Sequence, residues 1–292
     1  MASPIRSIPA PGLVLAGIVS VQVGAGFAKE LFASLPPSAV VFLRLLTSAV
    51  VLVLFTRSAL RATVRGASRS DLLVIVGFGL ALATMNLSIY ESFSRIPLGI
   101  AVTIEFLGPL AVSVAYSRRR LDLVWVGLAG LGVVLLARGS GGDLDVVGVG
   151  FAVLAGAGWA AYIVLSAQTG RRFEGSSGLA LASVVGTIAV APIGLSTGGT
   201  EMWRPDLLIV AVAIGLLSSV IPYTLELEAL RRMPPRVFGI LMSLEPAVAA
   251  LVGLVVLNEI LHLREWVAIG CVMAACLGAT RSRPHRPEAP EA

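Results

Sequence analysis

Eight charged residues lie within or at the ends of long apolar segments of this sequence, and they are the residues that could do chemistry. They are Lys29, Glu30, Arg44, Glu91, Glu105, Glu226, Glu228 and Glu245. If lipid surrounds these segments, each charge costs about 2.5–3.5 kcal/mol on insertion scales, so each needs a partner, a proton or a ligand. Those that pair within the protein serve its structure, and those that do not are candidates for binding a ligand or a proton.

Two of the acids, Glu105 and Glu245, are predicted to lie deepest. Glu245 stands about nine residues into its apolar run, which at 1.5 Å per residue corresponds to a depth of about 13 Å. Pro246 follows it directly, and Pro109 follows Glu105 by one turn; a proline leaves a carbonyl group of the preceding turn free. We interpret both acids as candidates for holding a proton or a cation. The alternative is a pair of buried acids neutralised by protons or by a structural arginine.

The two bases within the apolar segments allow similar alternatives. Arg44 is about 10 Å from the nearer end of its segment, a distance that its long side chain can largely span toward water. It could bind an anion or pair with an acid for structural reasons. Lys29 lies near the end of the first segment and is the only lysine in the chain. It could supply a compact titratable ammonium group, or it could simply reach the surface.

The remaining acids and several polar or aromatic residues are weaker candidates. Glu228 precedes Arg231 and Arg232 by three and four residues, a spacing that ordinary helical ion pairs explain. Glu226 has no such local partner, and Tyr223 precedes it by about one turn. Other polar and aromatic residues within the runs could line a cavity or could form hydrogen bonds between helices. They are Gln22, Asn86, Trp159, Tyr162, Ser166 and Gln168.

The composition indicates which elements position these residues. Hydrophobic residues make up 57% of the 292 residues, charged residues only 13%, and the mean hydropathy is +0.92. Soluble domains average about 25% charged residues, so lipid must cover much of this surface. A helix needs about 20 apolar residues to cross a bilayer. The sequence contains ten apolar runs, at 11–32, 37–56, 71–93, 98–116, 121–137, 147–167, 178–196, 206–228, 236–257 and 262–280.

The distribution of arginine predicts the topology. If the ten runs all cross the membrane, one side carries sixteen arginines and the opposite side carries four, namely Arg95, Arg138, Arg204 and Arg264. Positive residues concentrate on the cytoplasmic side. We therefore expect an even number of spans with both termini in the cytoplasm. The Pro-rich, charged tail at 281–292 is expected to be disordered.

An internal repeat predicts how the spans are grouped. The pattern E-x-x-x-R-x-P begins at Glu91 and again at Glu228, and Pro109 and Pro246 follow at the same offset of 137 residues. That offset corresponds to five spans, so segments 11–138 and 147–280 should be equivalent five-helix units. Because five is odd, the second unit must be inverted in the membrane. Inverted repeats are typical of transporters, since two similar halves can open opposite sides in turn.

Several other functions are disfavoured. The net charge of +5 comes from arginine clusters between apolar runs without interleaved aromatic residues, so nucleic acid is not an expected partner. The two cysteines, Cys271 and Cys276, point to different faces of one helix, and the two histidines are far apart, so we expect neither a disulfide nor a metal site. Nucleotide-binding and zinc-protease motifs are absent. The sequence predicts no enzyme and no cofactor.

Several strings resemble one known family. FLRLLTSA, IPLGIAVTIEFLGPLAV, GAGWAAYIVLSAQ and LMSLEPAVAAL are similar to EamA-type drug/metabolite transporters, with the greatest likeness to the threonine and homoserine exporters of bacterial inner membranes. The resemblance extends over residues 11–280. It implies two EamA repeats around a cavity lined mainly by spans one to four and six to nine, with spans five and ten peripheral. The cavity residues that it implies are Lys29, Arg44, Asn86, Glu105, Trp159, Tyr162, Tyr223, Glu226 and Glu245.

The resemblance also implies an activity that agrees with the chemistry of these residues. It implies outward transport of small amino acids driven by the proton motive force. A zwitterionic amino acid needs an acid for its ammonium group, which Glu105 or Glu245 could supply, and a base for its carboxylate, which Lys29 or Arg44 could supply. The alternatives are export of another metabolite or of cationic drugs by the same fold. The expected partners are the amino acid, protons and membrane lipid, and a homodimer is compatible with the sequence.

Overall fold

The computed structural model describes residues 8–115, 121–137, 144–173 and 176–281. These residues form helices joined by short turns, with no strand among them, as the sequence predicts. The polar tail predicted at 281–292 lies outside the described residues beyond Arg281. The helices are α1 (Ala10–Leu31), α2 (Pro37–Gly66), α3 (Arg69–Phe93), α4 (Leu98–Glu105), α5 (Leu107–Ala115), α6 (Leu121–Ala137), α7 (Val146–Arg172), α8 (Ser177–Gly198), η2 (Glu201–Trp203), α9 (Pro205–Gly215), η3 (Leu216–Val220), α10 (Ile221–Leu230), α11 (Pro235–Met242), α12 (Glu245–Leu257) and α13 (Leu263–Arg281).

Prolines fix where many of these helices begin. Helices α1, α2, α9 and α11 each carry a proline in the first turn, and Pro97 precedes α4 directly. A proline is favourable there because the first N–H groups of a helix have no partner within the helix, so the missing donor costs nothing. In α3 the first turn is closed instead by a capping box between Ser68 and Asp71.

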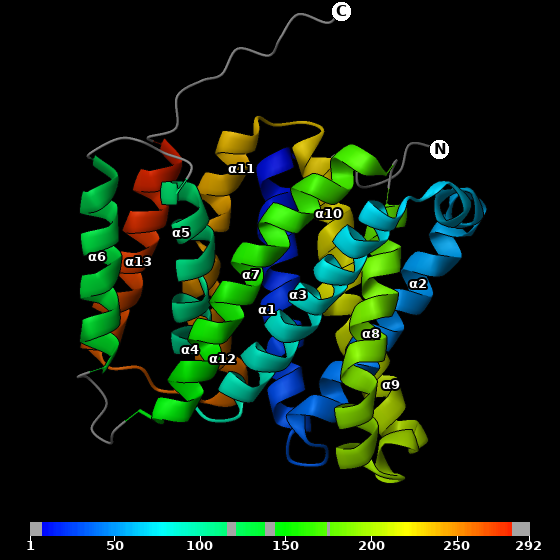
Figure 1. Cartoon of the computed structure of the whole chain (residues 1–292). Coiled ribbons are helices and arrows are strands. Elements are labelled where there is room, and N and C mark those ends of the chain that lie inside the picture. The colour runs from blue at the N-terminus through cyan, green and yellow to red at the C-terminus, as the bar shows by residue number, and fades with distance from the viewer. Residues whose placement is uncertain (1–7, 116–120, 138–143, 174–175, 282–292) are drawn as a thin grey trace, which may run out of the picture.

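The helices are suited to a membrane. Within the described residues, nine helical segments are long and apolar enough to cross a bilayer, and Leu123–Leu136 forms a shorter apolar helix. The polytopic α-helical class predicted from the sequence is therefore confirmed, whereas the tenth span and the inverted repeat stay predictions. Figure 1 shows the start of α1 and the end of α13 at the same end of the bundle. Helices α6 and α13 pack together at one edge, and α2 and α8 pack together at the other.

Three of the spans are not continuous α-helices. The span at Leu98–Ala115 is divided between α4 and α5 at Phe106, and the span that contains α11 and α12 is divided at Ser243 and Leu244. The apolar runs alone predict continuous helices here. The break at Phe106 lies about one turn before Pro109, and the break at Ser243 and Leu244 lies just before Pro246. A proline cannot donate a backbone hydrogen bond to the preceding turn. A third span contains the π-helical segment η3 between α9 and α10.

Close backbone contact holds the α4–α5 break against α7. A Cβ atom added to Gly108 would lie 2.0 Å from the carbonyl oxygen of Gly156, and one added to Gly156 would lie 2.9 Å from the carbonyl oxygen of Glu105. Both atoms that would be struck belong to the backbone and cannot move away alone. Glycine at 108 and 156 therefore allows α7 to approach the point where α4 ends.

Gly108→Ala is expected to destabilise the protein markedly. The added methyl group must force α7 away from the α4–α5 break, and overpacking of this kind costs about 1–3 kcal/mol or more. The measurement is the Tm of the purified protein in detergent. Gly130→Ala on α6 is the matched control, because no atom lies within 4 Å of the added Cβ. Equal Tm values for the two variants would contradict the close packing.

Candidate functional site

The broken helices surround one large cavity. Its volume is about 1250 Å³, and its lining comes from α1–α5, α7, η3 and α10–α13. Ligand cavities are commonly about 300–1,000 Å³, so this one has room for a small metabolite and water. Helix α6 contributes no lining residue, but α13 contributes Cys276, Ala279 and Thr280. The resemblance implies that spans five and ten are peripheral and that the other eight line the cavity. The described residues of α6, the fifth span, agree with this, whereas α13, the tenth, lines the cavity and α8, the seventh, does not.

The structure gathers most of the residues singled out in the sequence, and one lies elsewhere. Lys29 is not part of the cavity wall. The eight that line the cavity are Arg44, Asn86, Glu105, Trp159, Tyr162, Tyr223, Glu226 and Glu245.

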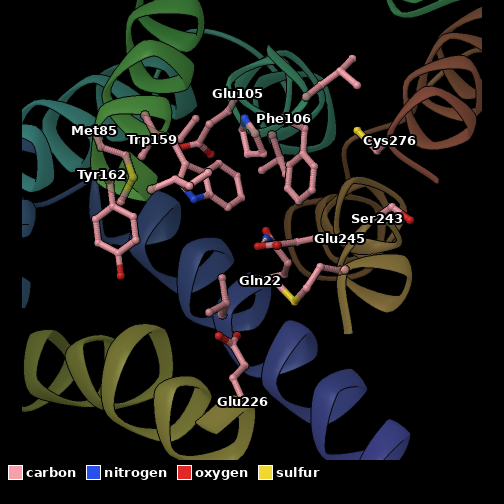
Figure 2. Close-up of a pocket in the computed structure, with 18 of the residues that line it drawn as sticks. Gln22, Met85, Glu105, Phe106, Trp159, Tyr162, Glu226, Ser243, Glu245 and Cys276 are labelled. Atoms are coloured by element: carbon pink, nitrogen blue, oxygen red, sulfur yellow. Dashed lines mark hydrogen bonds between the residues drawn. The ribbon is translucent and has the colours of Figure 1, made fainter. Parts of the chain in front are cut away.

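Three carboxyl groups face this space from three different helices. Glu105 is the last residue of α4 and Glu245 is the first residue of α12, so each stands where its span is broken. They are 8% and 7% exposed, and Glu226 reaches the cavity from α10. Figure 2 shows the three side chains directed into the same space. In the described part of the chain, none of the three lies within ion-pair distance of an arginine or lysine.

Among the described residues, the side chain of Glu245 has one hydrogen-bond partner. The Nε2 atom of Gln22 on α1 donates to its Oε1 atom at 2.9 Å (Figure 2). The second carboxyl oxygen of Glu245 and the amide oxygen of Gln22 are buried without a hydrogen bond to protein. Buried polar atoms are nearly always satisfied, so these two oxygens mark a place for a proton, a water molecule or a ligand.

Among the described residues, the partners of Arg44 are all neutral. Its guanidinium group donates to Oδ1 of Asn86 and, at 3.1 Å, to the carbonyl oxygen of Ser218, and it lies 5.3 Å from the ring centre of Tyr90. Asn86 is oriented by its own bond from Nδ2 to the carbonyl oxygen of Leu82 at 2.7 Å. The Nε atom of Arg44 is buried without a protein partner. Arg44 therefore keeps unused donors beside the cavity while its orientation is fixed.

The π-helical segment makes this arrangement possible. A π-helical turn displaces carbonyl groups from the regular α-helical bonding pattern, and such turns are frequent at functional sites. In η3 the carbonyl oxygen of Ser218 accepts from Arg44, and that of Leu217 accepts from the hydroxyl group of Ser20 at 2.7 Å. A Cβ atom on Gly24 would lie 2.3 Å from Oγ of Ser218, so α1 packs directly on η3.

Aromatic residues form another part of the wall. Trp159 and Tyr162 are on α7, three residues apart and therefore on one face. The ring of Trp159 meets Phe106 edge-on, with 4.8 Å between ring centres, and Tyr162 packs on Phe78 at 5.1 Å. Phe106 is the residue at the α4–α5 break. The aromatic contacts thus fix the wall next to Glu105.

Four charged residues in or beside the apolar runs remain: Lys29, Glu91 and Glu228 form ion pairs, and the side chain of Glu30 is exposed. Lys29 forms an ion pair with Glu259 at 2.6 Å and donates to the carbonyl oxygen of Ile96 at 2.8 Å. Glu228 pairs with Arg231 and Arg232 on the same helix, as its spacing predicts.

Some lining residues were not identified from the sequence. Tyr90, Phe106 and Ser218 carried no signal, because a tyrosine, a phenylalanine or a serine in an apolar span is ordinary. Gln22 was noticed only as a polar residue in an apolar run. The described residues contain no group of three or more His, Cys, Asp or Glu side chains that could hold a metal ion.

The fold and the cavity define a polytopic α-helical membrane protein with a large internal cavity, whose largely apolar wall carries Arg44 and three carboxyl groups. Residues 146–281 match the EamA-like transporter family. The chain is 38% identical over 271 residues to "Threonine/homoserine exporter RhtA" of Escherichia coli K12, covering 92% of this chain and 90% of that protein. The identity to RhtA of Salmonella typhimurium LT2 is 37% over 279 residues, covering 94% of this chain and 92% of that protein. The chain belongs to the EamA-like transporter family.

Two further similarities agree with this class. The chain is 25% identical to "Uncharacterized inner membrane transporter YedA" of Escherichia coli K12, covering 85% of this chain and 82% of that protein. A solved structure titled "Crystal structure of protein" matches with a TM-score of 0.60 and 18% identity, covering 92% of this chain and 96% of that one. At this identity the structural match supports the fold alone.

Proposed function

We propose that this protein exports small amino acids of the threonine and homoserine class across the bacterial inner membrane, driven by the proton motive force. The names of the relatives that are 37–38% identical support the substrate class. The single observation that carries the proposal is the cavity itself. It holds Arg44 and three carboxyl groups, and Arg44 forms no ion pair with any of the three.

Unpaired charges of both signs in one cavity suit a zwitterion. A desolvated charge is costly unless it is paired, so groups that served only the structure would be expected to pair with each other. An amino acid brings the missing partner for each side. Its ammonium group is assigned to Glu105 or Glu245, and its carboxylate to Arg44, whose planar guanidinium group matches a carboxylate. Of the two bases considered from the sequence, only Arg44 lines the cavity.

Arg44 also bears on the alternative substrates. A cationic drug would satisfy the carboxyl groups but would leave the guanidinium group unpaired and repel it, and such a substrate is disfavoured for that reason. Another metabolite that carries both charges would fit the same groups. Arg44 and the carboxyl groups would thus select small substrates that carry both a positive and a negative charge.

The membrane arrangement belongs to the same proposal. We infer ten spans, formed by inverted five-helix units at 11–138 and 147–280, with both termini in the cytoplasm. The 137-residue offset and the arginine distribution support this arrangement. In this orientation the proton gradient, acidic outside, can drive an amino acid outward by exchange for protons.

Efflux from proteoliposomes tests the function. Vesicles containing the purified protein and radiolabelled threonine should release it faster than protein-free vesicles, and a pH gradient should accelerate the release. Unlabelled homoserine should compete, whereas threonine methyl ester and N-acetylthreonine, which each lack one charge, should compete poorly. Equal competition by the ester would argue against the zwitterion site, and no release of any amino acid would refute the substrate class.

A further inference from the structure

Lys29 has a role that the cavity does not explain. It lies in the last turn of α1 and joins three segments that are distant in sequence. Figure 1 shows the end of α1 at the opposite end of the bundle from its start and from the end of α13. The Nζ atom of Lys29 lies 2.6 Å from Oε1 of Glu259 and 2.8 Å from the carbonyl oxygen of Ile96, and Oε2 of Glu259 accepts from the backbone N–H of Leu98 at 2.8 Å. We call these four residues, Lys29, Ile96, Leu98 and Glu259, the clasp.

The backbone is shaped to present Glu259 to its partners. Asn258 ends α12 in the left-handed conformation, with φ of 55°, and the N–H group of Glu259 bonds back to the carbonyl oxygen of Gly253. A Cβ atom on Gly253 would lie 2.6 Å from Oε2 of Glu259, so glycine leaves room for this carboxylate. The chain therefore folds Glu259 back over the end of α12 toward Leu98.

The clasp is connected to the cavity by two short helices. Glu259 accepts from the first N–H group of α4, and the eight-residue α4 ends at Glu105. Helix α12 begins at Glu245 and ends two residues before Glu259. The two helices pack closely, since a Cβ atom on Gly99 would lie 2.7 Å from Cα of Ala250. A movement that opens the clasp must therefore also shift the helices that carry the two cavity acids.

The clasp covers the closed end of the cavity. On α1 the lining extends only to Ala25, one turn before Lys29, and Ala28 between them is fully buried. Ile96 and Leu98 are also buried, at 2% and 0% exposure. At the opposite end the lining reaches Thr280, next to the last described residue of α13. The cavity thus extends toward the described ends of the chain and is blocked beneath the clasp.

From this geometry we infer that the Lys29–Glu259 pair, seated on the first turn of α4, is the lock of the outer gate. It holds the pathway closed on the outer side while the cavity accepts substrate from the cytoplasm, and it must separate when substrate is released outside. The assignment of inner and outer sides rests on the proposed function. A pair that only stabilised the fold would not need to separate in each cycle.

Thiol labelling tests the lock without any substrate. In a background with Cys271→Ser and Cys276→Ser, Ala25→Cys places one thiol on the cavity wall below the clasp. A membrane-impermeant thiol reagent is applied to intact cells and, separately, to inverted membrane vesicles. Glu259→Gln keeps an acceptor for the N–H group of Leu98 but removes the ion pair. It should raise the rate of labelling from outside roughly tenfold, as expected when a charge-assisted bond that favours the closed state is lost.

Two further variants keep the test decisive. Lys29→Met removes the opposite charge and should have the same effect, so a folding defect in one variant does not remove the test. Glu91→Gln is the matched control. Glu91 also forms an ion pair, at 2.6 Å, but its partner Arg95 is only four residues away in the sequence, so this pair does not join distant segments. Glu91→Gln should leave the labelling rate unchanged.

The outcomes separate the lock from the substrate assignment. Unchanged outside labelling in both Glu259→Gln and Lys29→Met would overturn the lock, even if amino-acid efflux is observed. Faster labelling in these variants, and not in Glu91→Gln, supports the lock even if the transported substrate proves to be another metabolite. Labelling that increases equally in all three variants would also overturn it, since a general loosening would then explain the result.

Discussion

Arg44→Gln is expected to weaken threonine binding by at least about 30-fold. The guanidinium group is the only base among the described cavity residues, and no carboxyl group of the described chain pairs with it. Removing one partner of a buried charge pair costs about 2–5 kcal/mol, and about 1.4 kcal/mol corresponds to a factor of ten. Competition against radiolabelled threonine in proteoliposomes measures the change.

The same variant should also lose its preference for a free carboxylate. In the wild type, threonine should compete much better than threonine methyl ester, and in Arg44→Gln the two should compete nearly equally. Arg44→Lys should recover only part of the preference, because an ammonium group cannot offer the planar pair of donors that a carboxylate matches. If Arg44→Gln still prefers threonine over the ester, the carboxylate is bound elsewhere.

A control variant separates this binding role from the support that Arg44 gives to η3. Ser20→Ala removes the side-chain bond that α1 makes to the π-helical segment, the one to the carbonyl oxygen of Leu217. Ser20 is not part of the cavity wall. If Ser20→Ala weakens threonine binding as much as Arg44→Gln does, distortion of η3 explains both results.

The sequence predicts the helices well because their signals are local. The apolar runs reflect contact with lipid, and prolines such as Pro37 and Pro205 mark helix starts through their own missing N–H groups. The breaks at Phe106 and Leu244 depend on more than the nearby prolines. The first of them also requires Gly108 to meet Gly156 of another helix, a contact between distant segments that no local pattern contains.

The residue types of the candidate site could be predicted from the sequence, but the partner of each side chain could not. Arg44 and Lys29 gave the same signal, a base in an apolar run. Their difference arises from partners that folding brings close: Lys29 meets Glu259, whereas Arg44 meets only neutral groups. For the same reason Gln22 could not be linked to Glu245 before the structure placed α1 beside α12.

The second large effect is expected at Glu245, as a hypothesis about proton coupling. Glu245 stands at the break between α11 and α12, and one of its carboxyl oxygens is buried without a protein partner. A carboxyl group in this position can hold either a proton or the ammonium group of the substrate. A proton that enters from the acidic outside would displace the amino acid, and loss of that proton to the cytoplasm would prepare the site again.

Glu245→Gln should therefore abolish the part of efflux that a pH gradient drives. Glutamine has nearly the same volume and can still bond with Gln22, so the protein should fold, but it cannot release a proton. Efflux is measured from proteoliposomes with and without an imposed gradient, together with exchange of labelled for unlabelled threonine at equal pH. Glu105→Gln is the comparison, and it should weaken substrate binding more than coupling. If Glu245→Gln keeps the full response to the gradient, Glu245 is structural, and the proton must be carried at Glu105 or Glu226.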